Sequence, residues 1–491
     1  METGILPFAE CLREIIAARG WSLDALAGMT GYKSRTSVAR LLQEQSSQKN
    51  RQRFFKRLCD SGALTQTEEK RLRAALDVSL IGMDKAIARG VFKELIVGSG
   101  AKEANSPNFE RLLELLRGAE RARILMVNCL YEPLFVALRD LLLENPNCTL
   151  RHYFILDEGE SQAAQAMYCL SRMTYLPNFC ACACERGKRN AGMLVGLNFL
   201  CATVEGGDGA TDVFALLSEN YRVALHRLPA EDGLFSFLER VLTQAMASAD
   251  AVTRFCSTDN GPQSFIDIMQ FWEETERNRD MYHVKSDLCV NNIPTQHLRA
   301  CLNERDLLRF FPELDVETLR RMIDTLLYFQ RLRYKNMYES KNPKHFILTM
   351  SGLRRFAQTG MTTEHFAAMR PFTVRERVVI LEDLLTNAEE NPHFYLYLFR
   401  EDFEPAYEIN CWDGLGMTAF PIVKQQETVD NYCNNVICHP RMVTAFRDYF
   451  MDDLRVEHTL TAPERSAFLR GLIEGLKAQR PQSRKEPGER A

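Results

Sequence analysis

The chain has 491 residues, of which 46% are hydrophobic and 26% are charged, and its mean hydropathy is −0.25. These values are ordinary for globular protein and exclude a disordered, collagenous or coiled-coil chain. Because domains commonly hold about 100–200 residues, we expect roughly three domains, each with its own apolar core. The first residues lack the pattern of an export signal, and the longest weakly charged run, 192–204, is too short for a bilayer. We therefore expect a cytoplasmic protein with no membrane partner.

The cysteine content and the charge distribution narrow the range of possible functions. The 15 cysteines are odd in number and scattered, so we expect reduced thiols that pack as small hydrophobes. The net charge is 61 − 65 = −4, but residues 33–57 carry eight Lys or Arg against one acid, Glu44, which is +7. Such a confined basic surface would attract a polyanion, although a solvated helix face would show the same charge.

Residues 7–80 predict short helices in close succession. Ser22 can accept hydrogen bonds from free amides at the start of a helix, and Gly31 would end that helix. The segment from Thr65 to Glu68 has the spacing of a capping box, which predicts another helix after it. The helices are expected at residues 8–18, 23–30 and 34–43, around Phe54, Phe55 and Leu58, and after Thr65 with Leu72, Ala75, Leu76 and Leu80 inward.

Residues 98–108 are small and polar, and this composition predicts a linker. The spacing of hydrophobic residues along the chain changes after it. Residues 123–130 and 149–157 suit buried strands, and 133–145 suits a helix between them. These three segments predict one βαβ unit of a parallel or mixed sheet. Two further strands and a helix are expected at 192–203, 221–227 and 235–246.

The remaining sequence predicts a helical region and a further sheet. A second boundary is expected at 251–262, a strand begins at 394, and the charged tail from 480 is expected to be disordered. The predicted fold class is multidomain, with an all-α N-terminal bundle followed by α/β regions with mixed sheets, joined by a helical segment. The expected divisions are 1–97 (N-terminal bundle), 98–108 (linker), 109–250 (α/β sensing domain), 263–387 (mainly helical region), 388–479 (α/β C-terminal region) and 480–491 (tail).

Two pairs of short segments form a weak internal repeat. The apolar strands at 155–160 and 398–403 each end in an acidic cluster, and 224–227 and 437–441 each place a His beside a basic residue before an amphipathic helix. The repeat hints at two related lobes, and coincidence between two α/β segments would explain it equally well.

The most specific local pattern covers residues 23–42. Ala27 is small where two helices must cross closely, Gly31 follows four residues later at a turn, and Val38 and Leu41 anchor the next helix. This pattern resembles the helix-turn-helix of the Cro and lambda-repressor type (XRE-like), over residues 8–60. The resemblance implies a recognition helix at 34–43 within a DNA-binding domain at 1–97. The predicted turn is one residue longer than in the commonest form of the motif.

Helical geometry divides this recognition helix into two faces. With successive residues 100° apart, Val38, Leu41 and Leu42 define the buried side, and Thr36, Arg40 and Gln43 lie opposite. Arg can read guanine and Gln can read adenine in the major groove, whereas cations on the following segment suit phosphate contacts. A bundle used for protein contacts is the alternative. The expected DNA-binding residues are Lys33, Ser34, Arg35, Thr36, Ser37, Arg40, Gln43, Arg51, Arg53, Lys56 and Arg57.

The sequence contains few motifs typical of catalysis or of metal binding. No GxxxxGK[ST], HExxH or GxSxG motif occurs, so we expect no catalytic residues and no cofactor. Cys180, Cys182 and Cys184 alternate and would share one face of a strand. Structural metal sites usually pair CxxC-type knuckles, so no metal ligand is assigned, and a redox or metal role of these cysteines stays open. His226 and His439 are faintly similar to the histidines of phospholipase-D-like lobes, but neither begins the required HxKxxxxD motif.

These patterns predict a bacterial DNA-binding transcriptional regulator. The expected partner is double-stranded DNA, bound by a homodimer, and the large C-terminal part would sense a small-molecule or protein effector or support oligomerisation. Two alternatives stay open: an enzyme of unknown reaction with an accessory helical domain, and a protein-interaction scaffold. The sequence does not indicate the operator or the direction of regulation.

Overall fold

The computed structural model describes sixteen stretches of the chain. They are residues 7–32, 34–43, 46–97, 107–156, 159–174, 176–185, 197–206, 209–217, 223–245, 250–255, 262–310, 312, 314–363, 369–400, 405–421 and 435–479. The chain forms two units, residues 1–91 with 159–162, and residues 92–158 with 163–491. Lys33, most of the expected linker and the expected tail lie outside the described residues.

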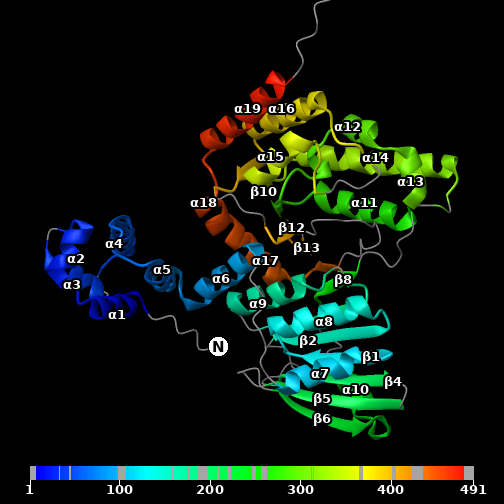
Figure 1. The fold of residues 1–491 in the computed structure, drawn as a ribbon, viewed down its shortest axis with the longest axis horizontal. Helices are drawn as coiled ribbons and strands as arrows, with labels where there is room; N and C mark the ends of the chain where they lie inside the picture. The colour runs from blue at the N-terminus through cyan, green and yellow to red at the C-terminus, as the bar shows by residue number, and fades with distance from the viewer. Residues whose placement is uncertain are drawn as a thin grey trace, which may run out of the picture. The chain divides into compact units, whose positions relative to one another are not determined.

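The first unit is an all-α bundle (Figure 1). Local signals end or begin its helices as the sequence predicts: the Ser22 hydroxyl accepts from the amide of Ala25, and Thr65 and Glu68 form a reciprocal capping box. Helices α1 to α5 all contribute to one core, which contains Phe8, Leu12, Leu26, Val38, Phe54 and Leu72. The helices are α1 (Phe8–Arg19), α2 (Leu23–Thr30), α3 (Arg35–Leu42), α4 (Gln48–Asp60), α5 (Gln66–Ile81) and α6 (Met83–Val97), the last of which ends in the second unit.

The first mixed sheet of the second unit contains the predicted βαβ unit, since β1 and β2 pair in parallel around α8. The strand expected at 123–130 ends at Val127, because Asn128 adopts a φ of 50° and its side chain accepts from the amide of Ile155. The elements are α7 (Pro107–Arg117), β1 (Arg121–Val127), α8 (Glu132–Glu144), β2 (Cys148–Leu156), α9 (Glu160–Ser171), β3 (Phe179–Glu185), β4 (Phe199–Gly206), β5 (Gly209–Leu217), β6 (Val223–Pro229), a 3-10 turn (Ala230–Asp232), α10 (Leu234–Ala245) and β7 (Asp250–Ala251).

The second sheet draws strands from the region expected to be mainly helical. That region does contain long helices, but β9 and β10 pair with each other and with β11 and β12, so residues 263–387 and 388–479 share one sheet. Its elements before residue 360 are β8 (Thr253–Phe255), α11 (Pro262–Arg277), β9 (Met281–Val284), a 3-10 turn (Val290–Asn292), α12 (Thr295–Cys301), α13 (Glu304–Phe310), α14 (Val316–Tyr338), β10 (Lys344–Leu348) and α15 (Met350–Thr359). The later elements are α16 (Val374–Glu390), β11 (Phe394–Leu398), β12 (Tyr407–Trp412), β13 (Gly416–Pro421), β14 (Asn435–Ile437), α17 (Pro440–Tyr449), a π-helical turn (Phe450–Leu454), α18 (Arg455–Glu457) and α19 (Ala462–Ala478).

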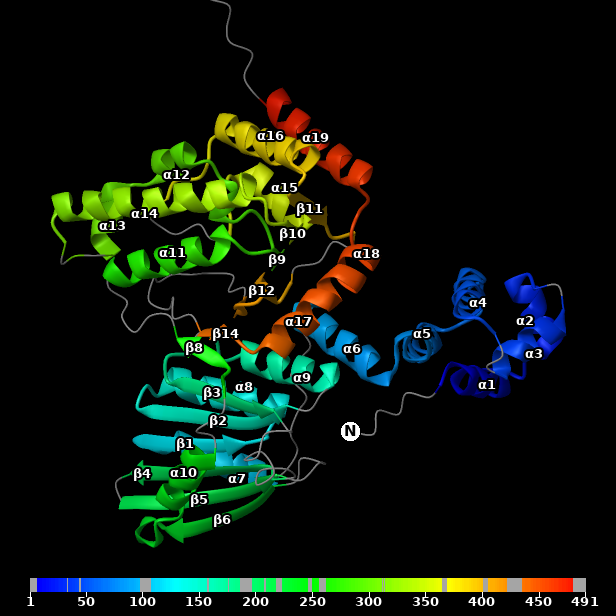
Figure 2. The same ribbon diagram turned by 180° about the vertical axis from the view of Figure 1, so that it is seen from behind.

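The two sheets have the same core topology. The first has the strand order β6-β5-β4-β1-β2-β3-β7, and the second has β11-β10-β9-β12-β13-β14-β8. Figure 2 shows β6, β5, β4, β1, β2 and β3 side by side in the first sheet. Three parallel strands followed by three antiparallel ones occur in both, so β1 corresponds to β9 and β6 to β14. The repeat inferred from the sequence aligned β2 with β11, whereas the topology aligns β2 with β10.

Helices pack on both faces of each sheet and bury side chains that alternate along the strands. On β2, His152 faces Phe135 of α8, whereas its neighbour Tyr153 packs in the cluster that includes Phe235 of α10. In the second sheet, α16 and α19 pack on the face of Phe346, and α17 with the turn at Phe450 covers the opposite face. The chain passes from the first sheet to the second at Val252, the residue between β7 and β8. None of the helices in the described part of the chain is both long and apolar enough to cross a membrane.

Candidate nucleic-acid interface

Helices α2 and α3 are joined by a tight turn at Gly31. This residue has a φ of 62°, a left-handed conformation that glycine adopts without the penalty a Cβ would bring. The amide of Tyr32 donates to the carbonyl oxygen of Ala27 at 2.9 Å, which closes the end of α2. Ser34 then begins α3 as its N-terminal flanking residue. The two short helices expected on either side of Gly31 are therefore present.

Tyr32 and Arg57 hold this turn against α4, and sequence reasoning did not assign either of these structural roles. The ring of Tyr32 packs edge-on against Phe54 with centroids 5.6 Å apart, and its hydroxyl donates to the carbonyl of Asn50. Arg57 Nη1 donates to the carbonyl oxygens of Thr30 and Gly31, at 3.2 and 3.3 Å. An aromatic residue directly after the turn glycine was the signal available in the sequence. The turn is thereby fixed by tertiary contacts as well as by glycine.

Helix α3 has the two faces predicted from its sequence. Val38 and Leu41 are buried in the bundle core, and Leu42 is half-buried. The opposite side carries side chains that can read base edges. The exposed residues on and beside α3 are Ser34, Arg35, Thr36, Arg40 and Gln43, and Ser37 is half-buried.

The end of α3 is tied to the rest of the bundle by Arg13, a contact that the sequence did not predict. Its guanidinium donates to the carbonyl oxygen of Leu42 at 2.8 Å. A cation at the C-terminal end of a helix satisfies a free carbonyl and complements the helix dipole. Arg13 therefore positions α3 from α1 without itself belonging to the exposed face.

The basic residues of α3 and α4 fall into two groups. Arg51 donates to the carbonyl of Ser46, and Arg57 bonds to the turn as described, so both stabilise the bundle. The other group consists of exposed cations that make no ion pair with any residue the structure describes. These are Arg35, Arg40, Lys49, Arg53 and Lys56. Uncompensated cations of this kind suit contacts with phosphate.

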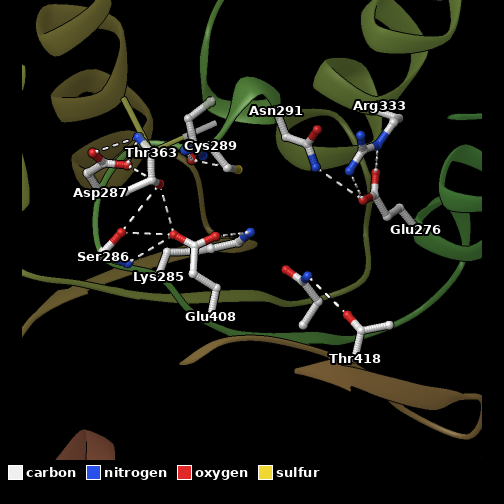
Figure 3. A network of polar contacts seen from close by, with 12 residues as sticks. Glu276, Lys285, Ser286, Asp287, Cys289, Asn291, Arg333, Thr363, Glu408 and Thr418 are labelled. Atoms are coloured by element: carbon white, nitrogen blue, oxygen red, sulfur yellow. Dashed lines mark hydrogen bonds and ion pairs between the residues drawn. The ribbon is translucent and has the colours of Figure 1, made fainter. Parts of the chain in front are cut away.

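A second concentration of polar side chains lies in the second unit, where β9 ends (Figure 3). Lys285 Nζ lies 3.0 Å from Glu408 Oε2, and the Ser286 hydroxyl donates to Glu408 Oε1 at 2.8 Å. The Thr363 hydroxyl lies within hydrogen-bond distance of both Asp287 and Glu408, so it bridges the two carboxylates. The Lys285 attraction and the hydrogen bonds to Glu408 outweigh the effect of its burial, and the pKa of Glu408 is lowered.

This buried cluster satisfies its own charges. Burial, followed by repulsion from Glu408, raises the pKa of Asp287 to about 6, while Arg355 and the amide of Thr363 hydrogen-bond to the carboxylate. Since each carboxylate is paired within the protein, we assign the cluster a structural role. Among the described residues, no group of three or more His, Cys, Asp or Glu is arranged to hold a metal ion.

The two histidines singled out in the sequence lie on different sheets. His226 is exposed on β6, and His439 is buried before α17. Their strands correspond in the topology, but the environments of the two imidazoles differ.

Comparisons with known proteins do not assign the chain to a family. No protein-family model matches it, and no curated protein does. Among solved structures, polyphosphate kinase from Porphyromonas gingivalis is similar at 10% sequence identity and a TM-score of 0.21. The match covers 75% of this chain, which spans about half (53%) of that kinase. At this TM-score the similarity supports no inference about fold or activity.

Proposed function

We propose that the chain is a sequence-specific DNA-binding transcriptional regulator that reads duplex DNA with α3. The observation that carries this proposal is the division of α3 into a buried face with Val38 and Leu41 and an exposed face with Thr36, Arg40 and Gln43. In the helix-turn-helix geometry, the start of the second helix enters the major groove. Arg35 and Thr36 lie at that start. On the same exposed side, Arg40 in the last turn would read a guanine, and Gln43 directly after the helix would read an adenine.

The cations of α3 and α4 would supply affinity that does not depend on sequence. Lys49, Arg53 and Lys56 are exposed on α4 and have no acidic partner in the described part of the chain. Contacts of such cations with phosphate release counterions, so binding should weaken steeply as salt rises. Lys33 belongs to the same proposed group. Arg51 and Arg57 contribute positive charge while they hold carbonyl oxygens of the bundle.

The second unit would supply symmetry and regulation. One recognition helix reads only a few base pairs, so specific binding commonly needs two helices about 34–36 Å apart. We propose a homodimer on a pseudo-palindromic site, with the two-sheet unit acting in dimerisation or in sensing an effector. Light scattering of the full-length protein, free and on a selected duplex, tests this part; a monomer in both states would contradict it.

The DNA-binding proposal is tested by selecting bound duplexes from a random pool with the full-length protein. We expect enrichment of one short, two-fold-symmetric sequence, and an affinity for it that falls as salt is raised. The variant Arg40→Ala/Gln43→Ala should lose the enrichment. Lys70→Ala is the control, because it removes an exposed cation from α5 of the same bundle. A pool that stays random after selection with the native protein would refute sequence-specific binding.

A further inference from the structure

Cys180 and Cys182 lie on one face of β3, in the first sheet of the second unit. Side chains along the strand alternate, so Phe179 and Ala181 are buried on the opposite face, whereas Cys180 is exposed and Cys182 is half-buried. Cys184, two residues further on the same face, is buried. The strand thus presents two neighbouring thiols, of which Cys180 is the more accessible.

A cation lies beside Cys180 on the same face of the sheet. Arg151 of β2 is the register partner of Cys180 in the parallel strand pair, and in-register side chains lie on the same face. Arg151 also lies 3.8 Å from Glu239 of α10. These two side chains and Arg240 help to line a surface hollow of about 510 Å³. A small reagent can reach Cys180 because its own side chain is exposed.

The same neighbours favour the ionised form of Cys180. A hydrogen bond from Cys182, with further help from Arg151 and Thr253, outweighs burial and lowers the pKa of Cys180 to about 6. The pKa of Cys182 is raised, first by its hydrogen bond to Cys180 and then by burial. The exposed position of Cys180 beside Arg151 favours its thiolate in the same direction.

We propose that Cys180 is a site of reversible oxidation by hydroperoxides, with Cys182 positioning its sulfur and an external small thiol completing the cycle. The Cys180 thiolate attacks one oxygen of the peroxide, an S–O bond forms and the O–O bond breaks. The leaving hydroxide or alkoxide takes a proton from solvent, so the peroxide is reduced and Cys180 becomes a sulfenic acid. A small thiol then forms a disulfide with Cys180 and releases water. A second molecule of the thiol attacks this mixed disulfide, which releases the Cys180 thiolate and the disulfide of the small thiol.

The geometry of β3 favours an external thiol over Cys182 in the second step. A disulfide needs Cβ atoms about 3.5–4.5 Å apart. Each residue of an extended strand rises about 3.3 Å, so Cβ atoms two residues apart are separated by more than that. Pairing with β2 on one side and with β7 on the other, at Cys182 and Ala251, holds the strand extended. Cys182 therefore acts as a hydrogen-bond donor rather than as the resolving thiol.

The first experiment treats the reduced, full-length protein with limiting hydrogen peroxide and dimedone at pH 7, and maps the sulfenic-acid label by peptide mass spectrometry. Cys59 is an internal control, because it is half-buried and its pKa is raised to about 11, mainly by burial. We expect Cys180 to be labelled at least roughly tenfold faster than Cys59, since the thiolate is the nucleophile. Equal rates at the two positions would overturn the proposal.

Two variants test the positioning by Cys182 and Arg151. Cys182→Ala should slow labelling of Cys180 and move the midpoint of its alkylation by iodoacetamide to higher pH, whereas Cys182→Ser, which keeps a donor, should preserve part of the rate. Arg151→Gln should shift the midpoint in the same direction, and it serves where the strand variant does not fold. Midpoints unchanged in all folded variants would overturn the positioning role.

The product that follows the sulfenic acid shows whether an external thiol or Cys182 reacts with Cys180. Peroxide followed by glutathione should add one glutathione to Cys180. Formation of a Cys180–Cys182 disulfide in place of that adduct would overturn the assignment of an external thiol.

Discussion

The guanidinium of Arg57 lies 3.3 Å from the carbonyl oxygen of Gly31, the residue at which α2 turns toward α3. This contact separates Arg57 from Arg53, which is exposed and has no partner among the described residues. Arg57→Ala should lower the free energy of unfolding by roughly 1 kcal/mol, because carbonyl groups at the turn lose their donor. Arg53→Ala should leave stability unchanged and lower the salt slope of DNA binding by about one. Chemical denaturation and salt titration of the two proteins report these quantities; equal stability of both variants would contradict the role of Arg57.

Gly31 and Gly28 form a matched pair for testing the turn. Gly31→Ala should destabilise the protein by about 1–2 kcal/mol, because an alanine there must keep a left-handed backbone. Gly28 lies within α2, and a Cβ there would meet no atom within 4 Å. Gly28→Ala should therefore stabilise the protein by up to about 1 kcal/mol through helix propensity. Thermal unfolding measures both changes, and a turn that tolerates alanine would show no difference between them.

Comparing substitutions at Arg40 and Lys70 distinguishes the reading of a base from general attraction between protein and DNA charges. Arg40→Ala should cost about 1–3 kcal/mol on the selected sequence and relax the preference at one base position. Lys70→Ala removes the same charge from α5 and should affect matched and scrambled duplexes alike. Competition binding on both duplexes gives the comparison. If Arg40→Ala weakens matched and scrambled binding by the same factor, Arg40 does not read a base.

Because the imidazole of His152 is buried, we expect the protein to lose stability in acid. It is buried on β2 between the rings of Phe135 and Phe154, neither ring nitrogen has a hydrogen-bond partner among the described groups, and burial lowers its pKa to about 3. Between the ordinary histidine pKa of about 6.5 and this value, the unfolded chain binds the extra proton. Stability should therefore fall as pH drops through that window, by at most about 1.4 kcal/mol per pH unit from this residue.

The variant His152→Leu removes the titrating group from the same buried position. Denaturation midpoints of the native protein and the variant, measured at several pH values, should show the native protein losing stability relative to the variant as the pH falls. Curves that stay parallel from pH 7 to pH 4 would show that His152 is not the source.

Because Lys285 and Glu408 form a buried ion pair, we expect the effects of substituting them on stability to be strongly coupled. Lys285→Met leaves the Glu408 carboxylate buried without its cation, which should cost about 3–5 kcal/mol. Lys285→Met/Glu408→Gln should be less damaging than the single variant, because the substituted amide carries no charge and can still accept from the hydroxyl of Ser286. Urea denaturation of the single and double variants measures this. A double variant less stable than Lys285→Met would contradict charge pairing as the reason.

Local signals in the sequence determined much of the first unit. Ser22, Gly31, and Thr65 with Glu68 act over three or four residues, so they predict helix ends without knowledge of the fold. The apolar stripe of Val38 and Leu41 likewise predicts which side of α3 is buried. For the same reason, the exposed residues Thr36, Arg40 and Gln43 could be named in advance, whereas their contact with DNA stays a prediction.

Contacts between distant parts of the chain decided the rest. The strands β9 and β10 are only four and five residues long, and they carry no alternating pattern because both faces of their sheet are covered. Lys285 and Glu408 are 123 positions apart, and Arg57 reaches back 26 positions to Gly31. Such pairings depend on which strands and helices become neighbours when apolar faces are buried, and no short-range pattern in the sequence records that choice. The sequence alone determined the helices of the bundle core, the faces of α3 and the shared face of the β3 thiols. The tertiary structure determined which strands combine in the second sheet, the anchored turn and the position of Arg151 beside Cys180.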